Sequence, residues 1–421
     1  MRIALVVHKF PPASIGGTEI YTLNLAQELS RRGHAVFVFY RHDQSTAEQS
    51  EAVWEEREGF RAYRVSRAFG VGSAFEQFLD TFFNLDIERA FRRFLDEVRP
   101  DVVHFQHVMS LSYRLIRLAK FRKVPVLLTL HDYWFVCSNS QLIWPKGQVC
   151  NSKAFGLNCA RCALARIRSP MMQPLRPLVA PLLCLRDALV RGAALQADVM
   201  VAPSHFLIQQ YIRRGFPEER FIYLENGIDV ERIKRYPYQP ATNGRIRFTY
   251  LGSLAWQKGV HILIEAFRGI PMEKAVLRIY GDPTVFPKYA AHLQKIADST
   301  NTFFKGQVPH ADVGRVLADT DVVVVPSLWY ENSPMVIQEA FAARVPVIAS
   351  RIGALAEKIQ HGVDGLLYPV GDAKALQETV CSLIAYPAQI DAFRTRIPGP
   401  VTVQRQVDIL EEHYHRVKTK F

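Results

Sequence analysis

The chain has 421 residues, which is too long for one ordinary hydrophobic core, so we expect two domains. Apolar residues make up 49% and charged residues 22%, an ordinary balance for a soluble globular protein. No apolar run reaches the roughly 18 residues that a transmembrane helix needs, so none is predicted.

The net charge of +12 comes mainly from the first half of the chain. Residues 1–200 carry 26 Lys and Arg against 18 Asp and Glu, an excess of 8, and the remainder carries 26 against 22, an excess of 4. A basic face can serve nucleic acid, anionic lipid or a phosphorylated substrate, or can simply be a soluble basic surface.

The first eight residues, Met1–His8, have a short apolar run and no small-residue cleavage site after it. We therefore interpret them as a buried strand rather than a signal peptide, and we expect a cytoplasmic protein.

Apolar runs rich in Val, Ile and Leu alternate with helix-like segments along the chain. Such runs are typical of parallel strands covered on both faces, so we predict an α/β fold with right-handed crossovers. The predicted strands are Ile3–His8, Ala35–Tyr40, Val102–Gln106, Val126–Leu130, Val199–Ala202, Arg247–Tyr250, Val276–Tyr280, Val322–Val325 and Val345–Ala349. Thr18–Arg32 is the clearest predicted helix, and Val401–Phe421 is predicted to be a lone amphipathic helix.

A polar, proline-containing stretch at residues 226–243 is predicted to be the interdomain linker. It separates an N-terminal domain, residues 1–225, from a C-terminal domain, residues 244–395. Residues 396–421 are predicted to form a final helix that packs back on the N-terminal domain.

Gly16 and Gly17 stand between the first predicted strand and the first predicted helix. Two glycines let the backbone approach a ligand closely, and the helix N-terminus presents free amides to an anion. A tight turn without any ligand would also favour two glycines.

A second loop, Gly252–Gly259, follows the strand Arg247–Tyr250 directly. Ligands of open α/β sheets bind beyond the carboxyl ends of the strands. Lys258 in this loop could neutralise a diphosphate, or could be a solvated surface lysine.

The third and most informative segment, Pro326–Ala340, follows the strand Val322–Val325. It places Glu331 in a loop and Glu339 eight residues later in the next helix, for which Ser333 is the predicted cap and Pro334 the first residue. Amides at this helix start could hold phosphate oxygens, and Glu339 could accept both hydroxyls of a ribose. Two ordinary surface carboxylates are the alternative.

With these segments the sequence resembles the family-4 retaining glycosyltransferases of the GT-B fold, over almost its whole length. The matching segments are Phe10–Pro12, Gly16–Glu19, Leu25–His34, Pro100–His104, Leu130–Asp132, Asn226–Asp229, Lys258–Gly259, Tyr280–Asp282, Gly306–Val308, the pair Glu331 and Glu339, and Gly362–Leu367. The resemblance implies two Rossmann-like domains facing across a cleft, with the acceptor on the N-terminal domain and a nucleotide diphosphate sugar, carried by UDP or GDP, on the C-terminal domain.

The resemblance also implies a role for each matching residue. His131, Glu331 and Lys258 are the expected catalytic residues. The expected donor-binding residues are Gly16, Gly17, Gly252, Ser253, Lys258, Gly281, Gln307, Val308, Glu331, Asn332, Ser333, Pro334, Met335, Val336 and Glu339. No cofactor is expected for catalysis, because Lys258 and helix dipoles take the part of a divalent ion. Ser253 departs from the family, which usually has Arg after this glycine, so the usual two-cation clamp is reduced to Lys258.

The implied reaction transfers the sugar with retention to a hydroxyl of a glycan or a lipid-linked acceptor, in surface polysaccharide or glycolipid synthesis. The leaving phosphate is expected to take the acceptor proton, and neither glutamate is expected to be a covalent nucleophile, unlike the carboxylates of retaining glycosidases. The alternatives are another GT-B enzyme, such as an epimerase or phosphorylase, and a catalytically silent nucleotide-sugar-binding or scaffold protein.

An insert at about residues 137–195 of the N-terminal domain carries four of the six cysteines. Cys137, Cys150, Cys159 and Cys162 lie within 26 residues, and the last two have a chelating spacing. A structural zinc site, ordinary free thiols and disulfides are the three interpretations, with disulfides disfavoured in the cytoplasm. Cys184 and Cys381 are expected to be isolated core residues.

The stretch Arg161–Arg191 of this insert contains six arginines, at positions 161, 166, 168, 176, 186 and 191, against the single acid Asp187. Apolar residues lie among them, which suits a segment on the anionic inner face of the membrane. Four prolines argue against one continuous helix here. An ordinary packed insert is the alternative, and nucleic acid is not an expected partner because no aromatic-basic motif accompanies the charge.

Overall fold

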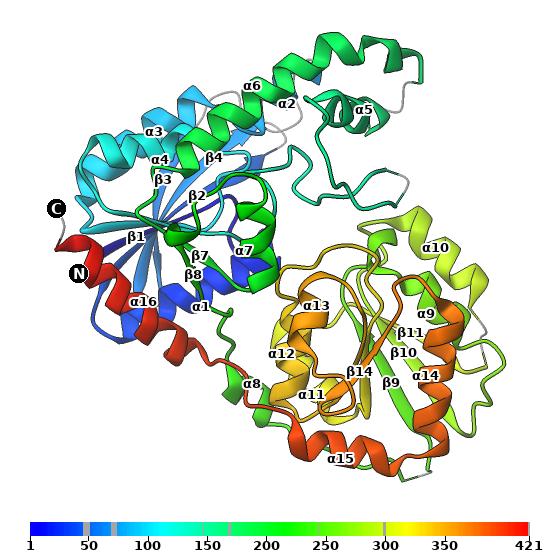
Figure 1. The fold of residues 1–421 in the computed structure, drawn as a ribbon. Helices are drawn as coiled ribbons and strands as arrows, with labels where there is room; N and C mark the ends of the chain where they lie inside the picture. Colours follow the sequence, from blue (N-terminus) through cyan, green and yellow to red (C-terminus); the bar gives the residue numbers. More distant parts are fainter. Residues whose placement is uncertain are drawn as a thin grey trace. The chain divides into compact units, whose positions relative to one another are not determined.

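The computed structural model of the chain describes residues 1–44, 51–68, 74–145, 147–166, 170–242, 244–297 and 300–419. It contains two compact units (Figure 1). Unit 1 comprises Met1–Gly227 and Val403–Phe421, and unit 2 comprises Ile228–Thr402. Arg168, Asn243 and the last two residues of the predicted C-terminal helix lie outside the described residues.

Unit 1 is built on an eight-stranded sheet of order β3-β4-β2-β1-β5-β6-β7-β8, in which only the β3–β4 pair is antiparallel among the described strands. The strands are β1 (Arg2–Val7), β2 (Ala35–Gln44), β3 (Glu51–Arg57), β4 (Phe60–Ala68), β5 (Val102–Phe105), β6 (Val126–Thr129), β7 (Val199–Ala202) and β8 (Phe221–Tyr223). Its helices are α1 (Gly17–Arg31), α2 (Ala74–Asp80), α3 (Leu85–Val98), α4 (Arg114–Phe121), α5 (Leu157–Arg166), η1 (Pro170–Leu175), α6 (Arg176–Ala194), α7 (His205–Ile212), η2 (Glu218–Arg220) and α16 (Val403–Lys418). Three strands of this sheet, β3, β4 and β8, were not predicted from the sequence. The edge strand β3 is charged and only partly buried, so it lacks the continuous apolar run of a buried strand.

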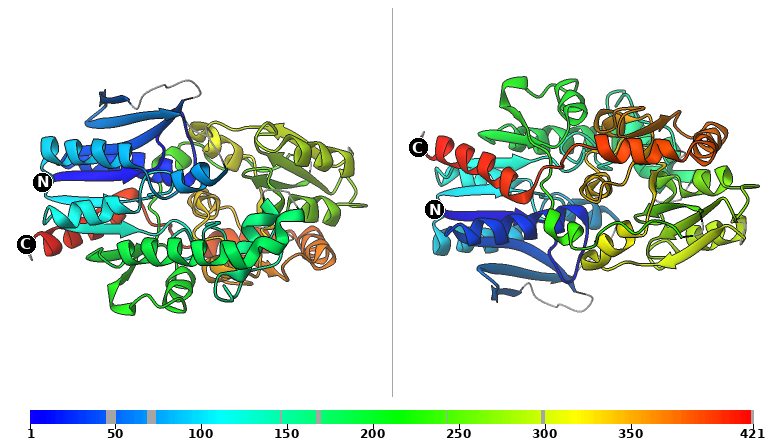
Figure 2. Two further views of the ribbon diagram at one scale, coloured as in Figure 1. Left: turned by 90° about the horizontal axis from the view of Figure 1, so that it is seen from above. Right: turned by 90° about the horizontal axis from the view of Figure 1, so that it is seen from below.

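The C-terminal helix α16 belongs to the core of unit 1. Val407, Leu410 and Tyr414 are buried with residues of α1 and of the first strands. Arg32, just after α1, donates to the carboxylates of Asp408 and Glu411 at 2.7 Å each. The two chain ends therefore lie at the same end of this unit (Figure 2).

Unit 2 is built on a six-stranded, all-parallel sheet of order β11-β10-β9-β12-β13-β14. The strands are β9 (Ile246–Leu251), β10 (Ala275–Tyr280), β11 (Thr302–Gly306), β12 (Val322–Val325), β13 (Val347–Ser350) and β14 (Gly365–Tyr368). Its helices are α8 (Val230–Lys234), η3 (Trp256–Lys258), α9 (Val260–Ala266), α10 (Pro287–Ile296), η4 (His310–Asp312), α11 (Val313–Ala318), α12 (Met335–Ala342), α13 (Gly353–Lys358), α14 (Ala373–Ala385) and α15 (Ala388–Arg396). The strand order reverses between β9 and β12, which makes this pair the topological switch point where such sheets bind ligands.

Most of the predicted linker, residues 226–243, belongs to unit 2, which begins at Ile228. Ile228, Val230 and Ile233 are buried in a core cluster of unit 2, and α8 forms here. Polar residues around these three apolar side chains concealed the helix. At the other end of the chain, residues 396–402 also belong to unit 2, so only the part from Val403 returns to unit 1.

Two local expectations about cysteines are wrong, because Cys184 and Cys381 are exposed rather than buried in a core. The proline-containing stretch Arg161–Arg191 is not one continuous helix, as predicted, but is divided among α5, η1 and α6. Within it α6 still runs for 19 residues, with Pro177 in its first turn, where a missing N–H costs nothing, and Pro181 inside it. Among the described residues, no helix is both long and apolar enough to cross a membrane.

His104 of β5 links the sheet of unit 1 to α16. Its protonation should make the stability of this unit depend on pH. Its Nδ1 lies 2.7 Å from the Tyr414 hydroxyl and its Nε2 lies 2.7 Å from Thr129 Oγ1. Burial lowers the pKa of His104 to about 3. Because the unfolded imidazole titrates near 6.5, the unfolded chain gains a proton first as the pH falls, and unit 1 should lose roughly 2 kcal/mol between pH 7 and pH 5 through this residue.

Urea unfolding at pH 7 and pH 5 checks this expectation. His104→Gln should lose less stability on acidification than the wild type, whereas His415→Gln, at an exposed position of α16, should behave as the wild type does. Equal pH dependence in His104→Gln and the wild type would show that His104 does not couple the fold to acid.

Candidate active site

Two loops of unit 2 meet at the switch point and bring Lys258 to Glu331. Lys258 Nζ lies 2.7 Å from Glu331 Oε1 and over the ring of Trp329. The same carboxylate oxygen accepts from Ser327 Oγ at 2.7 Å and from Trp329 Nε1 at 3.0 Å. Glu331 is buried, while Lys258 remains partly exposed. The pair therefore offers one cation and one anion side by side at the edge of the sheet.

Glycines and backbone bonds set the spacing of these loops. A Cβ at Gly259, whose φ is +70°, would lie 1.9 Å from the carbonyl oxygen of Pro326, so only glycine fits. Leu328 N donates to Gln257 O at 2.8 Å across the same contact. A Cβ at Gly281 would meet Gly252 O at 2.3 Å, which ties the loop after β10 to the loop after β9.

The helix after Glu331 begins one residue later than expected. α12 starts at Met335, and Pro334 rather than Ser333 takes the N-cap position, with extended backbone and no capping side chain. The predicted cap at Ser333 is therefore wrong, because the extended ψ of Pro334 keeps it outside the helix. Ser333 Oγ is buried without a hydrogen-bond partner in the structure.

Glu339 lies in α12 and already has a cationic partner. Arg232 Nη2 of α8 donates to Glu339 Oε1 at 2.6 Å, and His310 Nε2 lies 3.7 Å from the same oxygen. Burial raises the pKa of Glu339, and Arg232 opposes this rise. Burial, with the charge of Arg232, lowers the pKa of His310 to about 4, so His310 is neutral near pH 7.

The other predicted donor residues lie on the loops of the same sheet edge. Gly252 and Ser253 follow β9, Gly281 follows β10, and Gln307 and Val308 follow β11. Asn332, Met335 and Val336 flank the start of α12, and Asn332 is buried.

In unit 1, His131 stands beyond the carboxyl end of β6, in a cluster of histidines. Its Nε2 lies 3.0 Å from Gln106 Oε1, and its ring packs edge-on against Tyr21 with centroids 4.8 Å apart. His8 and His107 follow the neighbouring strands β1 and β5, with ring centroids 4.6 Å apart. Asp132 Oδ2 lies 2.9 Å from His107 Nε2.

Two of these histidines, His131 and His8, are held neutral near pH 7. Burial, followed by the charge of His107, lowers the pKa of His131 to about 3. Burial and His107 also lower the pKa of His8 well below its usual range. His131 can therefore exchange hydrogen bonds with a substrate near pH 7 without presenting a positive charge.

The loop of Gly16 and Gly17 is closed by the chain's own carboxylate. Gly16 is the N-cap of α1, which begins at Gly17, one residue before the predicted start. Glu19 folds back over Gly16, accepts from Ser14 Oγ at 2.7 Å and lies 3.7 Å from His8 Nε2. A negative group thus already occupies the positive end of the α1 dipole.

Five residues beside the predicted site residues were not themselves predicted as site residues from the sequence: Arg232, His310, His8, His107 and Glu19. His8 is the last residue of one predicted strand and His107 directly follows another, so the rule that sites form at carboxyl strand ends could have found them. Arg232 and His310 have no such pattern, because their partner Glu339 lies far away in the sequence.

The four clustered cysteines lie in three places: Cys137 in a turn, Cys150 at the end of a short hairpin, and Cys159 and Cys162 in the helix after it. Ile143 and Val149 form an antiparallel bridge, Cys150 N donates to Leu142 O at 2.7 Å, and α5 then carries Cys159 and Cys162. All four thiols are free and partly buried. Burial raises the pKa of Cys159 to about 12, and the charges of Cys137 and Cys150 contribute to this rise.

Among the residues that the structure describes, however, no three His, Cys, Asp or Glu side chains are already placed to hold a metal ion. Zinc binding therefore stays a prediction.

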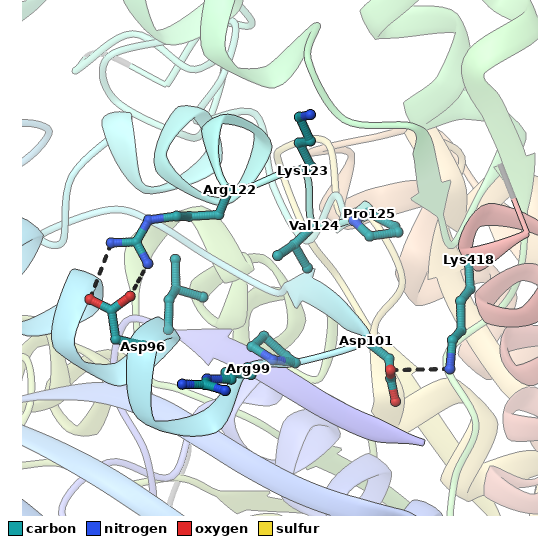
Figure 3. A pocket seen from close by; sticks show the side chains of 10 residues that line it. Asp96, Arg99, Asp101, Arg122, Lys123, Val124, Pro125 and Lys418 are labelled. Atoms are coloured by element: carbon teal, nitrogen blue, oxygen red, sulfur yellow. Dashed lines mark hydrogen bonds and ion pairs between the residues drawn. The ribbon is translucent and has the colours of Figure 1, made fainter. Parts of the chain in front are cut away.

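A separate pocket of about 710 Å³ lies at the opposite edge of the unit 1 sheet (Figure 3). Two ion pairs line it, Arg122 with Asp96 and Lys418 with Asp101. Apart from Lys418 of α16, the lining residues precede β5 and β6, at the amino ends of these strands, and none of the lining residues is a predicted site residue. Open α/β sheets bind their ligands beyond the carboxyl ends of the strands, so this pocket at the amino ends is not a candidate substrate site.

Comparisons with known proteins match both units. The family model described as Glycosyltransferase Family 4 matches residues 15–232, and the model described as Glycosyl transferases group 1 matches residues 236–396.

Two curated relatives have informative names. The glycogen synthase of Mycobacterium tuberculosis is 27% identical over 400 residues, covering 92% of this chain and 87% of that protein. The amylovoran biosynthesis glycosyltransferase AmsK of Erwinia amylovora is 27% identical over 190 residues, covering 43% of this chain and 46% of that protein.

Solved structures share the fold. The sucrose-phosphate synthase of Thermosynechococcus elongatus has a TM-score of 0.72 at 20% identity and covers both chains completely. Anabaena HepE, in complex with UDP and glucose, has a TM-score of 0.68 at 16% identity and covers 98% of this chain and 99% of its own. The predicted α/β, GT-B fold class is confirmed.

The partners of Glu339 generate the first prediction for the site. Glu339→Gln should lower the affinity for the donor nucleoside diphosphate about ten- to a hundredfold, since a charge-assisted hydrogen bond contributes roughly 1.5–3 kcal/mol. The isosteric change is preferable to alanine, because the amide oxygen can still accept a hydrogen bond from the buried Arg232, which alanine would leave without any acceptor. Isothermal titration calorimetry measures the effect.

Glu265→Gln, at an exposed position of α9, is the matched control and should bind the nucleotide as the wild type does. If Glu339→Gln binds with wild-type affinity, Glu339 does not contact the ribose.

The cysteine cluster generates a metal prediction. Protein made in zinc-replete medium should carry about one zinc per chain, lost in a Cys159→Ala, Cys162→Ala variant but not in Cys184→Ala, whose thiol lies on α6 outside the cluster. Elemental analysis and thiol titration measure this. If the wild-type protein is free of metal and all four cluster thiols titrate freely, the predicted zinc site does not exist.

Proposed function

Because this chain belongs to Glycosyltransferase Family 4 and is a glycosyltransferase, we propose that it transfers a sugar with retention from a nucleotide diphosphate sugar to a hydroxyl acceptor. Unit 2 would bind the donor and unit 1 the acceptor. That the two units share one reaction centre stays a prediction.

The observation that carries this proposal is the pair of glutamates in their structural context. Glu331 contacts Lys258 at the switch point, and Glu339 lies in the helix that starts there. A diphosphate would draw Lys258 from Glu331, which would free that carboxylate for the hydroxyls of the donor sugar. Glu331 would keep its hydrogen bonds from Ser327 and Trp329, so it would stay in place when Lys258 moves.

Charge development explains the proposed roles. As the sugar–phosphate bond breaks, negative charge grows on the diphosphate, and Lys258 with the amides at the start of α12 would stabilise it. The sugar becomes oxocarbenium-like, and a neutral His131 would add no opposing positive charge. The acceptor hydroxyl would attack from the face of the leaving phosphate, which would take its proton. Neither glutamate would act as a covalent nucleophile.

Glu331 also has a structural reason not to act as a nucleophile. Three donors share its Oε1, from Lys258, Ser327 and Trp329. Such bonds lower the nucleophilicity of a carboxylate and fix its orientation, which suits a group that holds hydroxyls.

The relatives' names support a place in polysaccharide or glycolipid synthesis, since one is a glycogen synthase and another an amylovoran biosynthesis glycosyltransferase. We propose a glycan or lipid-linked acceptor, and UDP or GDP as the nucleotide. HepE has been solved with UDP and glucose, which makes UDP-sugars the first donors to test.

A donor screen followed by product analysis tests the proposal. UDP-, GDP- and ADP-sugars are compared by thermal shift, because a ligand that binds only the folded chain raises its melting temperature. The selected donor is then incubated with glycan and lipid-linked acceptors, and NMR determines the anomeric configuration of the product. We expect one nucleotide to stabilise the protein and the product to keep the donor configuration.

An inverted product would contradict the retaining mechanism. Donor binding without transfer to any acceptor or to water, in a protein with His131, Lys258, Glu331 and Glu339 intact, would favour the silent nucleotide-sugar-binding protein.

A further inference from the structure

The solvent-facing side of α6 is apolar from Pro177 to Ala188, which is the reverse of an ordinary surface helix. Leu178 is 72% exposed, Leu185 is 57% exposed and Leu182 is 47% exposed. They follow one another at helical spacing, and Leu175 precedes them on the same side. The remaining exposed positions of this side are Pro174, Pro177, Pro181, Cys184 and Ala188. A contiguous apolar stripe of this kind marks a contact surface.

Two charged residues in the middle of α6, Arg186 and Asp187, point the other way, into unit 1. Arg186 is buried, donates to Trp134 O at 3.0 Å and pairs with Asp187 at 2.9 Å. Asp187 also accepts from Lys153 at 2.5 Å. Because the core satisfies these charges, none of them interrupts the apolar stripe. The sequence pattern alone gave no sign of this orientation.

Basic side chains stand beside the stripe. α5 packs against α6 and η1 (Figure 1). A hollow of about 460 Å³ lies among Leu157, Asn158, Arg161, Gln173, Pro174, Arg176 and Pro177, and no Asp or Glu belongs to this lining. Arg161 is exposed with its guanidinium 5.3 Å from the centroid of Trp144, and Arg176 bonds to Gln173 at 2.8 Å. A phosphate group is the complement of such a hollow.

We propose that this α5–α6 face, formed by Leu157, Arg161, Leu175, Leu178, Leu182 and Leu185 with Arg176 beside them, docks on an anionic lipid bilayer. The leucines enter the boundary between headgroups and acyl chains, and the arginines meet lipid phosphates in the hollow. A second copy of the chain fits this face less well, because it would set arginines against arginines without a carboxylate in the stripe to neutralise them.

The docking would bring unit 1 to a lipid-linked acceptor, and this purpose rests on the proposed function. Binding to vesicles requires neither donor nor catalysis. The two proposals can therefore fail separately.

Vesicle flotation of the full chain tests the docking. Vesicles of phosphatidylcholine alone, and with one third phosphatidylglycerol, are compared at low and high salt. The wild type should float with the anionic vesicles, and less so at high salt because the charges are screened. Leu178→Glu with Leu182→Glu should lower the partition coefficient about tenfold or more, and Arg161→Gln with Arg176→Gln should do so selectively for anionic vesicles.

Tyr386→Glu is the matched control, since Tyr386 is an exposed apolar residue of unit 2. It should float as the wild type does. Nucleotide affinity measured by calorimetry should be unchanged in every variant, which shows that unit 2 is folded and separates docking from donor binding. Far-ultraviolet circular dichroism and the melting temperature check unit 1.

Wild-type protein that floats with neither vesicle, or variants that float as well as the wild type, would overturn the docking. So would a wild-type dimer in solution that Leu178→Glu converts to a monomer, without vesicle binding, because a second copy would then cover the face.

Discussion

The contact of Gly259 with the carbonyl oxygen of Pro326 is the constraint on which the candidate donor site depends. A side chain at Gly259 would overlap that oxygen, so the loops after β9 and β12 can approach this closely only with glycine here. The approach places Lys258 next to Glu331 and directs the chain into α12, where Glu339 lies. One backbone contact thus arranges a cation and two carboxylates beyond the strands of a single sheet.

The two units differ in the electrostatics they offer at their strand ends. Unit 2 offers paired charges, with Lys258 on Glu331 and Arg232 on Glu339. A donor can exchange with these partners without exposing an unpaired buried charge, since diphosphate and hydroxyl groups replace what each side chain gives up. Unit 1 instead offers the neutral imidazole of His131, because burial depresses the pKa of this residue. This division suits a reaction in which a diphosphate leaves and a cation-like sugar forms.

The sequence predicts the fold and the positions of the candidate donor loops well. It does not predict contacts between residues that are far apart in the chain. Continuous Val-rich runs such as Val322–Val325 correctly predict buried parallel strands. The placement of Glu331 in a loop and Glu339 in the next helix is also predicted correctly, because the two residues are close in sequence. The partner Arg232 could not be predicted, because only the folded chain brings it to Glu339. The orientation of α6 could not be predicted either, since Arg186 faces the core while Leu178 and Leu185 face solvent.

The most direct test of the account replaces Lys258 with methionine and compares calorimetric affinities for the donor nucleoside diphosphate and for the corresponding nucleoside. Methionine keeps the length and apolar stem of lysine, and Glu331 retains its bonds from Ser327 and Trp329. The account predicts a roughly ten- to hundredfold loss of diphosphate affinity with nucleoside binding unchanged, as expected for one charge-assisted contact to phosphate. Equal affinity of Lys258→Met and the wild type for the diphosphate would contradict it.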